Sequence, residues 1–204
     1  MKKIKNLLMT TLRNKETSMT NFRGAADKLA LVLAQEAADY LETISSTITT
    51  PLNTQTTGVI IKKNLILVPI LRSGLALVPA FLHFYPQAKI GVIGAKRDEE
   101  TAIAHLYYKN LPPISADDQV IVLDPMLATG GSLLMTLKIL IDLGIKEEQI
   151  LFVGVICATE GYNLIKKEFP KINMIIAAQD SKLNDKKYII PGLGDFGDRY
   201  FGTE

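Results

Sequence analysis

One stretch of the chain decides the fold: Val120-Ile121-Val122-Leu123-Asp124-Pro125-Met126-Leu127-Ala128-Thr129-Gly130-Gly131-Ser132. Its opening residues are all apolar, which is typical of a strand buried on both faces within a parallel sheet. The apolar pattern of residues 133–143, closed by Gly144, predicts a helix directly after the glycines. A strand that leads into a helix in this way places residues 124–132 at the carboxyl edge of an α/β sheet, where ligands bind.

The same alternation of strands and helices extends through the chain. Strand-length apolar runs occupy residues 65–71, 89–95, 120–123, 150–157 and 172–177. Helix-length segments occupy residues 22–41, 74–85, 130–143 and 159–169. Together they predict one domain of 204 residues, built as a mostly parallel, twisted sheet flanked by helices, with right-handed crossovers.

Two segments fall outside this alternation. Residues 97–113 are charged at first and then carry Leu106, Tyr107 and Tyr108. This pattern predicts a protruding hairpin that serves either as a dimer contact or as a plain surface excursion. Residues 181–204 show no regular period, and we expect them to form a C-terminal flap.

The composition excludes several classes of protein. A hydrophobic share of 48% with 22% charged residues is typical of a globular domain, and a net charge of +2 is too small for a nucleic-acid-binding surface. The apolar runs are short or interrupted by proline and arginine, so neither a membrane span nor a signal peptide is expected. The single cysteine, Cys157, lies in an apolar run, which predicts a buried, inert thiol and fits a cytoplasmic location.

The loop at residues 124–132 has the chemistry of a phosphate-binding site. Gly130 and Gly131 leave backbone N–H groups accessible, and the helix start adds positive dipole potential. Thr129 and Ser132 add hydroxyl donors, while Asp124 can accept hydrogen bonds from ribose hydroxyls. The lysine of a Walker loop is missing, which disfavours hydrolysis of a nucleoside triphosphate. An ordinary capped turn between a strand and a helix explains the same residues equally well.

Two further strand ends carry basic residues. The run 65–71 leads into Arg72 and Gly74, where a planar guanidinium can bind a diphosphate. The run 89–95 leads into Lys96 and Arg97. Each arginine taken alone is more often a solvated surface group. Because three consecutive strand ends supply anion-binding groups, one shared site is favoured over three separate surface features.

The C-terminal segment contains Gly192-Leu193-Gly194-Asp195-Phe196-Gly197, which fits the Gly-x-Gly-x-x-Gly pattern of dinucleotide-binding proteins. That pattern requires a following helix and a second strand, and residues 198–204 are too few for both. We therefore reject it. A glycine-dense loop with one aromatic residue can instead enclose a planar base through main-chain groups, and the alternative is a frayed C-terminus.

These motifs resemble one known family over essentially the whole chain. Asp124 to Ser132 resembles the phosphoribosyl-diphosphate motif of the type I phosphoribosyltransferases, in the version found in uracil phosphoribosyltransferases, because Asp124-Pro125 replaces the usual pair of acidic residues. Residues 69–74, 97–101 and 188–203 are similar to the same family. The resemblance implies the type I phosphoribosyltransferase fold and the conversion of uracil and 5-phosphoribosyl 1-diphosphate to UMP and diphosphate, with Mg²⁺ carried on the diphosphate.

The resemblance also implies a role for each motif. The catalytic residues would be Asp124, Arg72 and Arg97. The phosphoribosyl diphosphate would contact these three and also Pro125, Met126, Leu127, Ala128, Thr129, Gly130, Gly131, Ser132 and Asp195. Uracil would be enclosed by Ile189, Gly194, Asp195 and Phe196. Phe196 stands where the family usually has alanine, which leaves its effect on base size open.

Alternatives remain at this point. One is a regulatory protein that keeps the site as a sensor of phosphoribosyl diphosphate, and another is a phosphoribosyltransferase that acts on a different base, such as a purine. The near-neutral charge and the complete base loop favour the uracil enzyme. The resemblance implies a homodimer or homotetramer and leaves open whether a nucleotide such as GTP regulates it. His83 and His105 are assigned no catalytic role.

Overall fold

A central sheet of eight strands organises the molecule, of which the computed structural model describes residues 1–97 and 104–203. Its main path runs in the order β10 (Asn173–Asp180), β9 (Ile150–Ala158), β7 (Gln119–Leu123), β3 (Leu65–Leu71), β5 (Val92–Arg97) and β6 (Ala104–Asn110). Two short strands join it, β4 (Lys89–Ile90) beside β3 and β8 (Met126–Leu127) beside β9. All neighbours are parallel except β6, which is antiparallel to β5. The mostly parallel sheet predicted from the sequence is confirmed.

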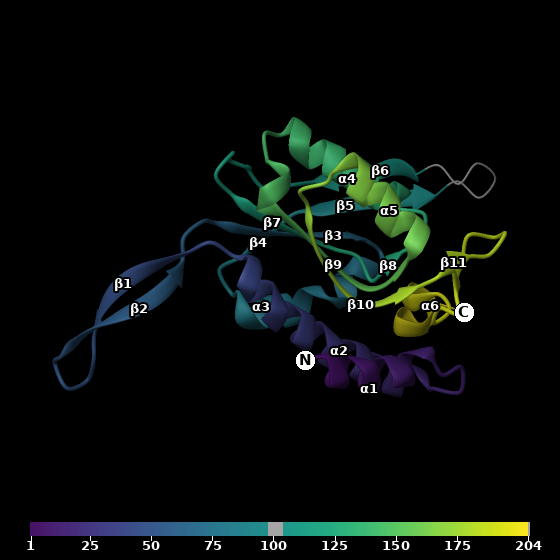
Figure 1. Ribbon diagram of the computed structural model, residues 1–204, viewed down its shortest axis with the longest axis horizontal. Helices are drawn as coiled ribbons and strands as arrows, with labels where there is room; N and C mark the ends of the chain where they lie inside the picture. The colour runs from purple at the N-terminus through teal and green to yellow at the C-terminus, as the bar shows by residue number, and fades with distance from the viewer. Residues whose placement is uncertain (98–103, 204) are drawn as a thin grey trace.

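Helices cover both faces of the sheet (Figure 1). One face carries α1 (Lys2–Arg13), α2 (Met19–Ala37) and α3 (Val78–Phe84), and the other carries α4 (Gly131–Asp142) and α5 (Thr159–Glu168). Short 3₁₀ turns lie at η1 (Ala38–Tyr40), η2 (Ser73–Ala76) and η3 (Glu147–Gln149). The sheet therefore separates two hydrophobic cores. None of the described helices has the length and apolar character needed to cross a membrane.

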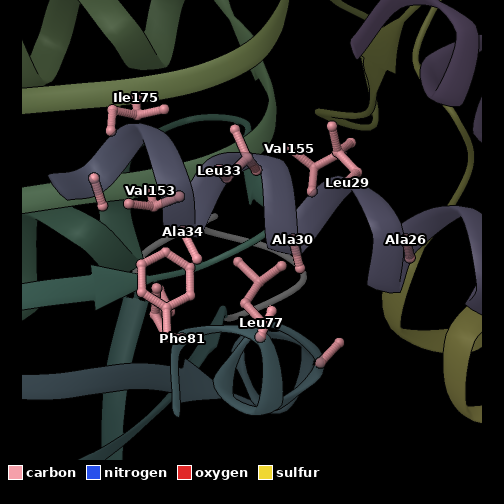
Figure 2. Close-up of a cluster of buried hydrophobic side chains, with 14 of the residues drawn as sticks. Ala26, Leu29, Ala30, Leu33, Ala34, Leu77, Phe81, Val153, Val155 and Ile175 are labelled. Carbon is pink, nitrogen blue, oxygen red and sulfur yellow. The ribbon is translucent and has the colours of Figure 1, made fainter. Parts of the chain in front are cut away.

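The core around α2 shows why this helix forms (Figure 2). Its N-terminus is capped by Ser18, whose Oγ accepts a hydrogen bond from the N–H of Asn21 at 3.4 Å. The buried face alternates leucines with alanines, and the small alanines let the helix approach its neighbours closely. Leu29 and Leu33 are fully buried and face residues of α3 and the sheet. Truncating such a leucine to alanine costs about 2–5 kcal/mol.

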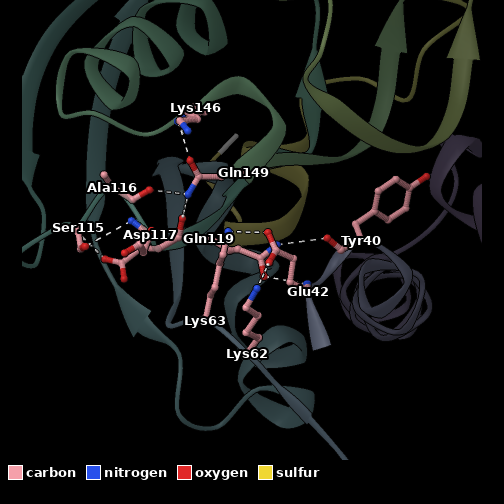
Figure 3. A network of polar contacts seen from close by, with 11 residues as sticks. Tyr40, Glu42, Lys62, Lys63, Ser115, Ala116, Asp117, Gln119, Lys146 and Gln149 are labelled. Atoms are coloured by element: carbon pink, nitrogen blue, oxygen red, sulfur yellow. Dashed lines mark hydrogen bonds and ion pairs between the residues drawn. The ribbon is translucent and has the colours of Figure 1, made fainter. Parts of the chain in front are cut away.

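A polar network closes the amino edge of the sheet (Figure 3). The side chain of Gln119 accepts from the N–H of Glu42 at 3.0 Å and donates to the carbonyl of Tyr40 at 3.3 Å. Gln149 donates to the carbonyls of Ala116 and Asp118, each at 2.8 Å. Within the described residues, every buried side-chain nitrogen or oxygen has a hydrogen-bond partner. The polar groups at the amino edge of the sheet are therefore satisfied within the protein itself.

A long hairpin that the sequence analysis did not predict extends from the body (Figure 1). It consists of β1 (Thr43–Thr49) and β2 (Gln55–Ile61), paired antiparallel along their whole length. The sequence had predicted a hairpin elsewhere, at residues 97–113. In that region β6 pairs antiparallel with β5 at the edge of the main sheet, and residues 98–103 lie outside the described part of the chain.

The C-terminal segment is more regular than its sequence pattern indicates. It contains a small antiparallel pair, β11 (Lys182–Leu183) with β12 (Ile189–Ile190), and then the helix α6 (Phe196–Phe201). Asp195 caps this helix, because its side chain accepts a hydrogen bond from the N–H of Asp198 at 3.0 Å. Figure 1 shows α6 beside the N-terminal helices, and α6 contacts α2.

Candidate functional site

The strand order creates a crevice at the carboxyl edge of the sheet. Strands β3 and β7 are neighbours, but the chain passes from β3 to β5 on one side before it returns to β7 on the other. The loops that follow β3 and β7 therefore diverge to opposite faces, which is the arrangement that forms ligand sites in open parallel sheets. Arg72 and Asp124 directly follow these two strands. The fold thus brings two of the predicted site residues together.

The loop after β7 surrounds a cavity of about 180 Å³. Helix α4 begins after Gly130, whose φ of 89° lies in the left-handed region that favours glycine. No side chain caps this helix start in the part of the chain that the structure describes. The N–H of Gly131 makes only a long contact of 3.5 Å to the hydroxyl oxygen of Thr129, so the helix start still offers donors, and the helix dipole favours an anion there. The cavity is lined by Asp124, Met126, Leu127, Ala128, Thr129, Gly130, Gly131, Ser132 and Leu133.

Asp124 is held at the mouth of this cavity by weak hydrogen bonds. Its Oδ1 lies 3.3 Å from the N–H of Met126 and 3.4 Å from the hydroxyl of Ser73. Burial, opposed by these bonds and reinforced by the nearby charge of Asp195, raises the pKa of Asp124 to about 7. The carboxyl is therefore poised to gain hydrogen-bond donors or positive charge from a ligand.

The loop after β3 packs directly onto the strand end that carries Asp124. A β-carbon at Gly74 would lie 2.3 Å from the carbonyl oxygen of Leu123, so only glycine allows this approach. The peptide bond between Leu71 and Arg72 is cis. The close packing of Gly74 on Leu123 fixes the position of Arg72 relative to the loop after β7.

Arg72 is exposed and is oriented by the C-terminal helix. Its Nη2 donates to Asp198 Oδ1 at 2.8 Å, and its guanidinium lies 5.3 Å from the ring centroid of Phe201. Hydrogen bonds from Thr203 and Arg72 hold the pKa of Asp198 below its usual value, although partial burial opposes them. A β-carbon at Gly197 would lie 3.2 Å from Asp195 Oδ1 and 3.4 Å from Arg72 Nη2. The guanidinium and the carboxylate of Asp195 therefore both border Gly197.

Arg97 ends β5, at the same edge of the sheet. Leu71 pairs with Gly94 in the parallel ladder between β3 and β5, so residues 95–97 continue beyond the end of β3 toward the crevice side. The side chain of Arg97 lies outside the described part of the structure. Its predicted contact with a diphosphate stays a prediction.

The base-binding segment predicted at the C-terminus is joined to the loop after β7. The N–H of Phe196 lies 3.3 Å from the sulfur of Met126. Gly194 and Asp195 are exposed, whereas the side chain of Ile189 is buried in the core. The ring of Phe196 is also fully buried, edge-to-face with Phe22 at 5.3 Å and stacked on Tyr200 at 5.7 Å. The phenylalanine is thus accommodated by the core.

Two features of the site escaped the sequence analysis. The ion pair between Arg72 and Asp198 joins residues far apart in the chain, so no local sequence pattern predicts it. The sulfur contact of Met126 is equally invisible, because methionine in a loop is ordinarily a packing residue. The prediction for Cys157 is confirmed, since the thiol is buried and burial, followed by the charge of Asp180, raises its pKa to about 12.

Comparison with known proteins identifies the family. The family model described as uracil phosphoribosyltransferase matches residues 2–203. The chain belongs to the uracil phosphoribosyltransferase family. Among its relatives, the uracil phosphoribosyltransferase of Dictyostelium discoideum is 40% identical, covering 97% of this chain and 91% of the relative. That of Lactococcus lactis strain IL1403 is 42% identical, covering 96% and 93%.

Solved structures agree with this family assignment. The AQ2163 protein from Aquifex aeolicus superposes with a TM-score of 0.89 at 35% identity, covering 98% of this chain and 95% of that one. The adenine phosphoribosyltransferase of Giardia lamblia, at 13% identity, has a TM-score of 0.53 and covers 77% of this chain and 80% of its own. The second likeness shows the fold alone. Both the predicted family and the predicted phosphoribosyltransferase fold are confirmed.

Proposed function

We propose that this member of the uracil phosphoribosyltransferase family transfers the phosphoribosyl group of 5-phosphoribosyl 1-diphosphate to uracil. The products are UMP and diphosphate. One observation carries the proposal: a phosphate-sized cavity, a carboxyl group and an arginine converge with the C-terminal base loop at the crevice between β3 and β7. Each group matches one part of the two substrates.

The 5′-phosphate fits the cavity after β7. Residues 128–132 line it, so their main-chain N–H groups and the hydroxyls of Thr129 and Ser132 would supply the donors. Anion binding at a helix start contributes about 0.3–1 kcal/mol through the dipole, in addition to the hydrogen bonds themselves. This loop would anchor the ribose with its C1′ atom toward the crevice.

The diphosphate would be bound by Arg72 and Arg97. The contact with Asp198 occupies one edge of the Arg72 fork, so it orients the guanidinium before substrate arrives. Among the described residues, no group of three His, Cys, Asp or Glu side chains could hold a metal ion by itself. Mg²⁺ would therefore be carried on the diphosphate of the substrate, and the neighbouring carboxylates of Asp124 and Asp195 would favour a cation there. Bound Mg²⁺ would neutralise charge on the departing diphosphate.

Asp124 would act on the ribose ring. As its carboxylate, it can accept hydrogen bonds from the ribose hydroxyls and stabilise the positive charge that develops at C1′. The bond from C1′ to the diphosphate oxygen breaks, the bond from C1′ to uracil N1 forms, and the N1 proton leaves to solvent. The main chain at residues 194–196, which is fixed from beneath by the buried ring of Phe196, would hold the base.

The proposed assembly is a homodimer or homotetramer in which the β1–β2 hairpin contacts a second copy of the chain. Leu52 at the hairpin tip is 86% exposed and Val59 is 69% exposed. A two-stranded hairpin with apolar side chains in water is marginally stable alone, and such exposure is typical of an interface. We expect Val59→Lys to lower the mass measured by light scattering, and an unchanged mass would contradict a role for the hairpin.

Incubation of the chain with labelled uracil, phosphoribosyl diphosphate and Mg²⁺ tests the proposed reaction. We expect labelled UMP, with no comparable product from adenine, hypoxanthine or cytosine. Parallel reactions with and without GTP show whether a guanine nucleotide changes the rate. A folded chain that binds phosphoribosyl diphosphate but transfers it to no base would contradict the proposal and favour a sensor protein. If the phosphoribosyl group were transferred to another base and not to uracil, the proposed reaction type would stand but the proposed base would be wrong.

A further inference from the structure

The base-binding loop is held by residues from the opposite end of the chain. Residues 191–195 connect β12 to α6 and include the proposed base contacts at Gly194 and Asp195. Two arginines tie this loop to the end of α1. Figure 1 shows the N-terminal helices beside α6, where these contacts occur.

Arg13, the last residue of α1, closes a ring of hydrogen bonds with this loop. Its Nη1 and Nη2 donate to Asp180 at 2.8 and 2.6 Å. Nη1 also donates to the carbonyl of Gly192 at 2.8 Å, and the N–H of Gly192 donates back to Asp180 Oδ2 at 2.8 Å. Both main-chain polar groups of Gly192 are therefore fixed by this one ion pair.

Arg199 binds the adjacent residue of the loop. Its Nη1 donates to the carbonyls of Leu193 at 2.6 Å and Leu12 at 2.5 Å, and its Nη2 donates to the carbonyl of Asn14 at 2.8 Å. The guanidinium also lies over the ring of Phe22, 4.3 Å from its centroid. The main chain of residues 192 and 193 is thus attached to residues 12–14.

The ion pair of Arg13 with Asp180 is well shielded from solvent. The side chain of Asp180 is 6% exposed and that of Arg13 is 28% exposed. Burial disfavours the charged carboxylate, but the bonds from Arg13 and Gly192 outweigh it, so the pKa of Asp180 lies below its usual value. Shielded ion pairs contribute little net stability compared with apolar residues, but they define geometry when every polar group is paired.

We propose that Arg13 is a positioning residue for the base: acting through Asp180 and Gly192, it holds the main chain that binds uracil. The inference deepens the proposed function and rests on it, because Arg13 contacts the loop and not the substrate. Asp180 ends β10, so the ion pair also connects the loop to the sheet. Displacing the loop should weaken base binding while the phosphate cavity, on a separate segment, stays intact.

The experiment compares three variants of the full chain with the wild type. Arg13→Ala removes the contacts to Asp180 and Gly192, and Arg13→Lys keeps the charge but not the planar fork. Lys5→Ala is the matched control, because Lys5 lies on the same helix and forms a 2.9 Å ion pair with Glu36 that does not involve the loop. The measurements are KM for uracil, KM for phosphoribosyl diphosphate, and hydrogen exchange of residues 189–196.

We expect Arg13→Ala to raise KM for uracil about tenfold, the factor that one weakened hydrogen bond to the base accounts for, and KM for phosphoribosyl diphosphate less than about twofold. Arg13→Lys should be intermediate, and only the Arg13 variants should speed exchange in residues 189–196. Equal behaviour of Arg13→Ala and Lys5→Ala in both measurements would overturn the inference. If Arg13→Ala does not fold, the comparison of Arg13→Lys with Lys5→Ala decides it.

Failure of the proposed function has a different signature. If the wild type forms no UMP, the proposed reaction fails, and hydrogen exchange still decides whether Arg13 holds the loop. If the wild type forms UMP and the Arg13 variants match the control, only the positioning role is lost.

Discussion

The two edges of the central sheet are built differently. At the amino edge, Gln119 and Gln149 are satisfied by neighbouring main-chain groups. At the carboxyl edge, the start of α4 has no side-chain cap, and Asp124 has only long hydrogen bonds and a pKa raised to about 7. One edge stabilises the fold, whereas the other keeps groups ready for a ligand. Substitutions at the amino edge should therefore lower mainly the stability of the fold, whereas substitutions at the carboxyl edge should lower mainly the activity.

Replacing Asp124 should have the largest effect. We expect Asp124→Asn to lower turnover by about 10²–10³-fold, because a group aimed at transition-state charge is lost. The folded chain binds the Asp124 proton more tightly than the unfolded chain, so this carboxyl destabilises the fold as pH rises from about 4 to 7. The asparagine side chain of the variant carries no such charge, and the variant should melt a few degrees higher at pH 8, at about 2–4 °C per kcal/mol.

Turnover of UMP formation and calorimetric melting at pH 8 check this expectation. A variant with wild-type turnover would remove Asp124 from the mechanism. A lower melting temperature would show that its charge does not destabilise the fold.

The pH dependence of the wild type should reflect the same carboxyl group. If the ionised form of Asp124 is required, kcat/KM for phosphoribosyl diphosphate should fall about tenfold per unit below its pKa of about 7. Initial rates measured from about pH 5 to about pH 9 should therefore show a bend near the pKa of this group. A profile that stays flat from about pH 5 to about pH 9, as expected if the pKa keeps the ordinary aspartate value near about 4, would contradict the raised pKa.

Replacing Gly130 should weaken substrate binding in the phosphate cavity specifically. We expect Gly130→Ala to raise KM for phosphoribosyl diphosphate roughly tenfold and to destabilise the fold by about 1–3 kcal/mol, because alanine is strained at a φ of 89°. Gly144→Ala is the matched control, since Gly144 follows α4 at its other end with a φ of 93° and open space around it. Steady-state kinetics and urea unfolding compare the two, and equal KM values would contradict the role of the loop.

The amino edge should respond in stability alone, with the smallest effect. Gln119→Ala leaves the N–H of Glu42 and the carbonyl of Tyr40 without their partner, which should cost about 1–3 kcal/mol of unfolding free energy. Urea unfolding measures this loss, and kinetic constants should stay at wild-type values. A large change in kcat would show that the two edges are coupled.

Parts of the fold follow from local sequence. The run 65–71 predicts β3 with its observed bounds, because its residues are apolar on both faces and polar Asn64 and Arg72 flank them. The β1–β2 hairpin could not be found in the same way. Its side chains are exposed on both faces, so burial imposes no periodic pattern on the sequence.

The site was predictable where chemistry lies next to a strand end. Asp124 and Arg72 follow β7 and β3 directly, and parallel strands bring their carboxyl ends to one edge. The contacts that hold these groups were not predictable, because Asp198 reaches Arg72 from a distant part of the chain. The burial of Phe196 likewise depends on Phe22 from the N-terminal helix.

A crystal structure of the full chain with UMP tests the central claim most directly. We expect the phosphate among the N–H groups of residues 128–132, the ribose hydroxyls on Asp124, and the uracil ring against the main chain of residues 194–196. The amino edge should be unchanged. A nucleotide bound with its phosphate or its base away from the crevice between β3 and β7 would contradict the account.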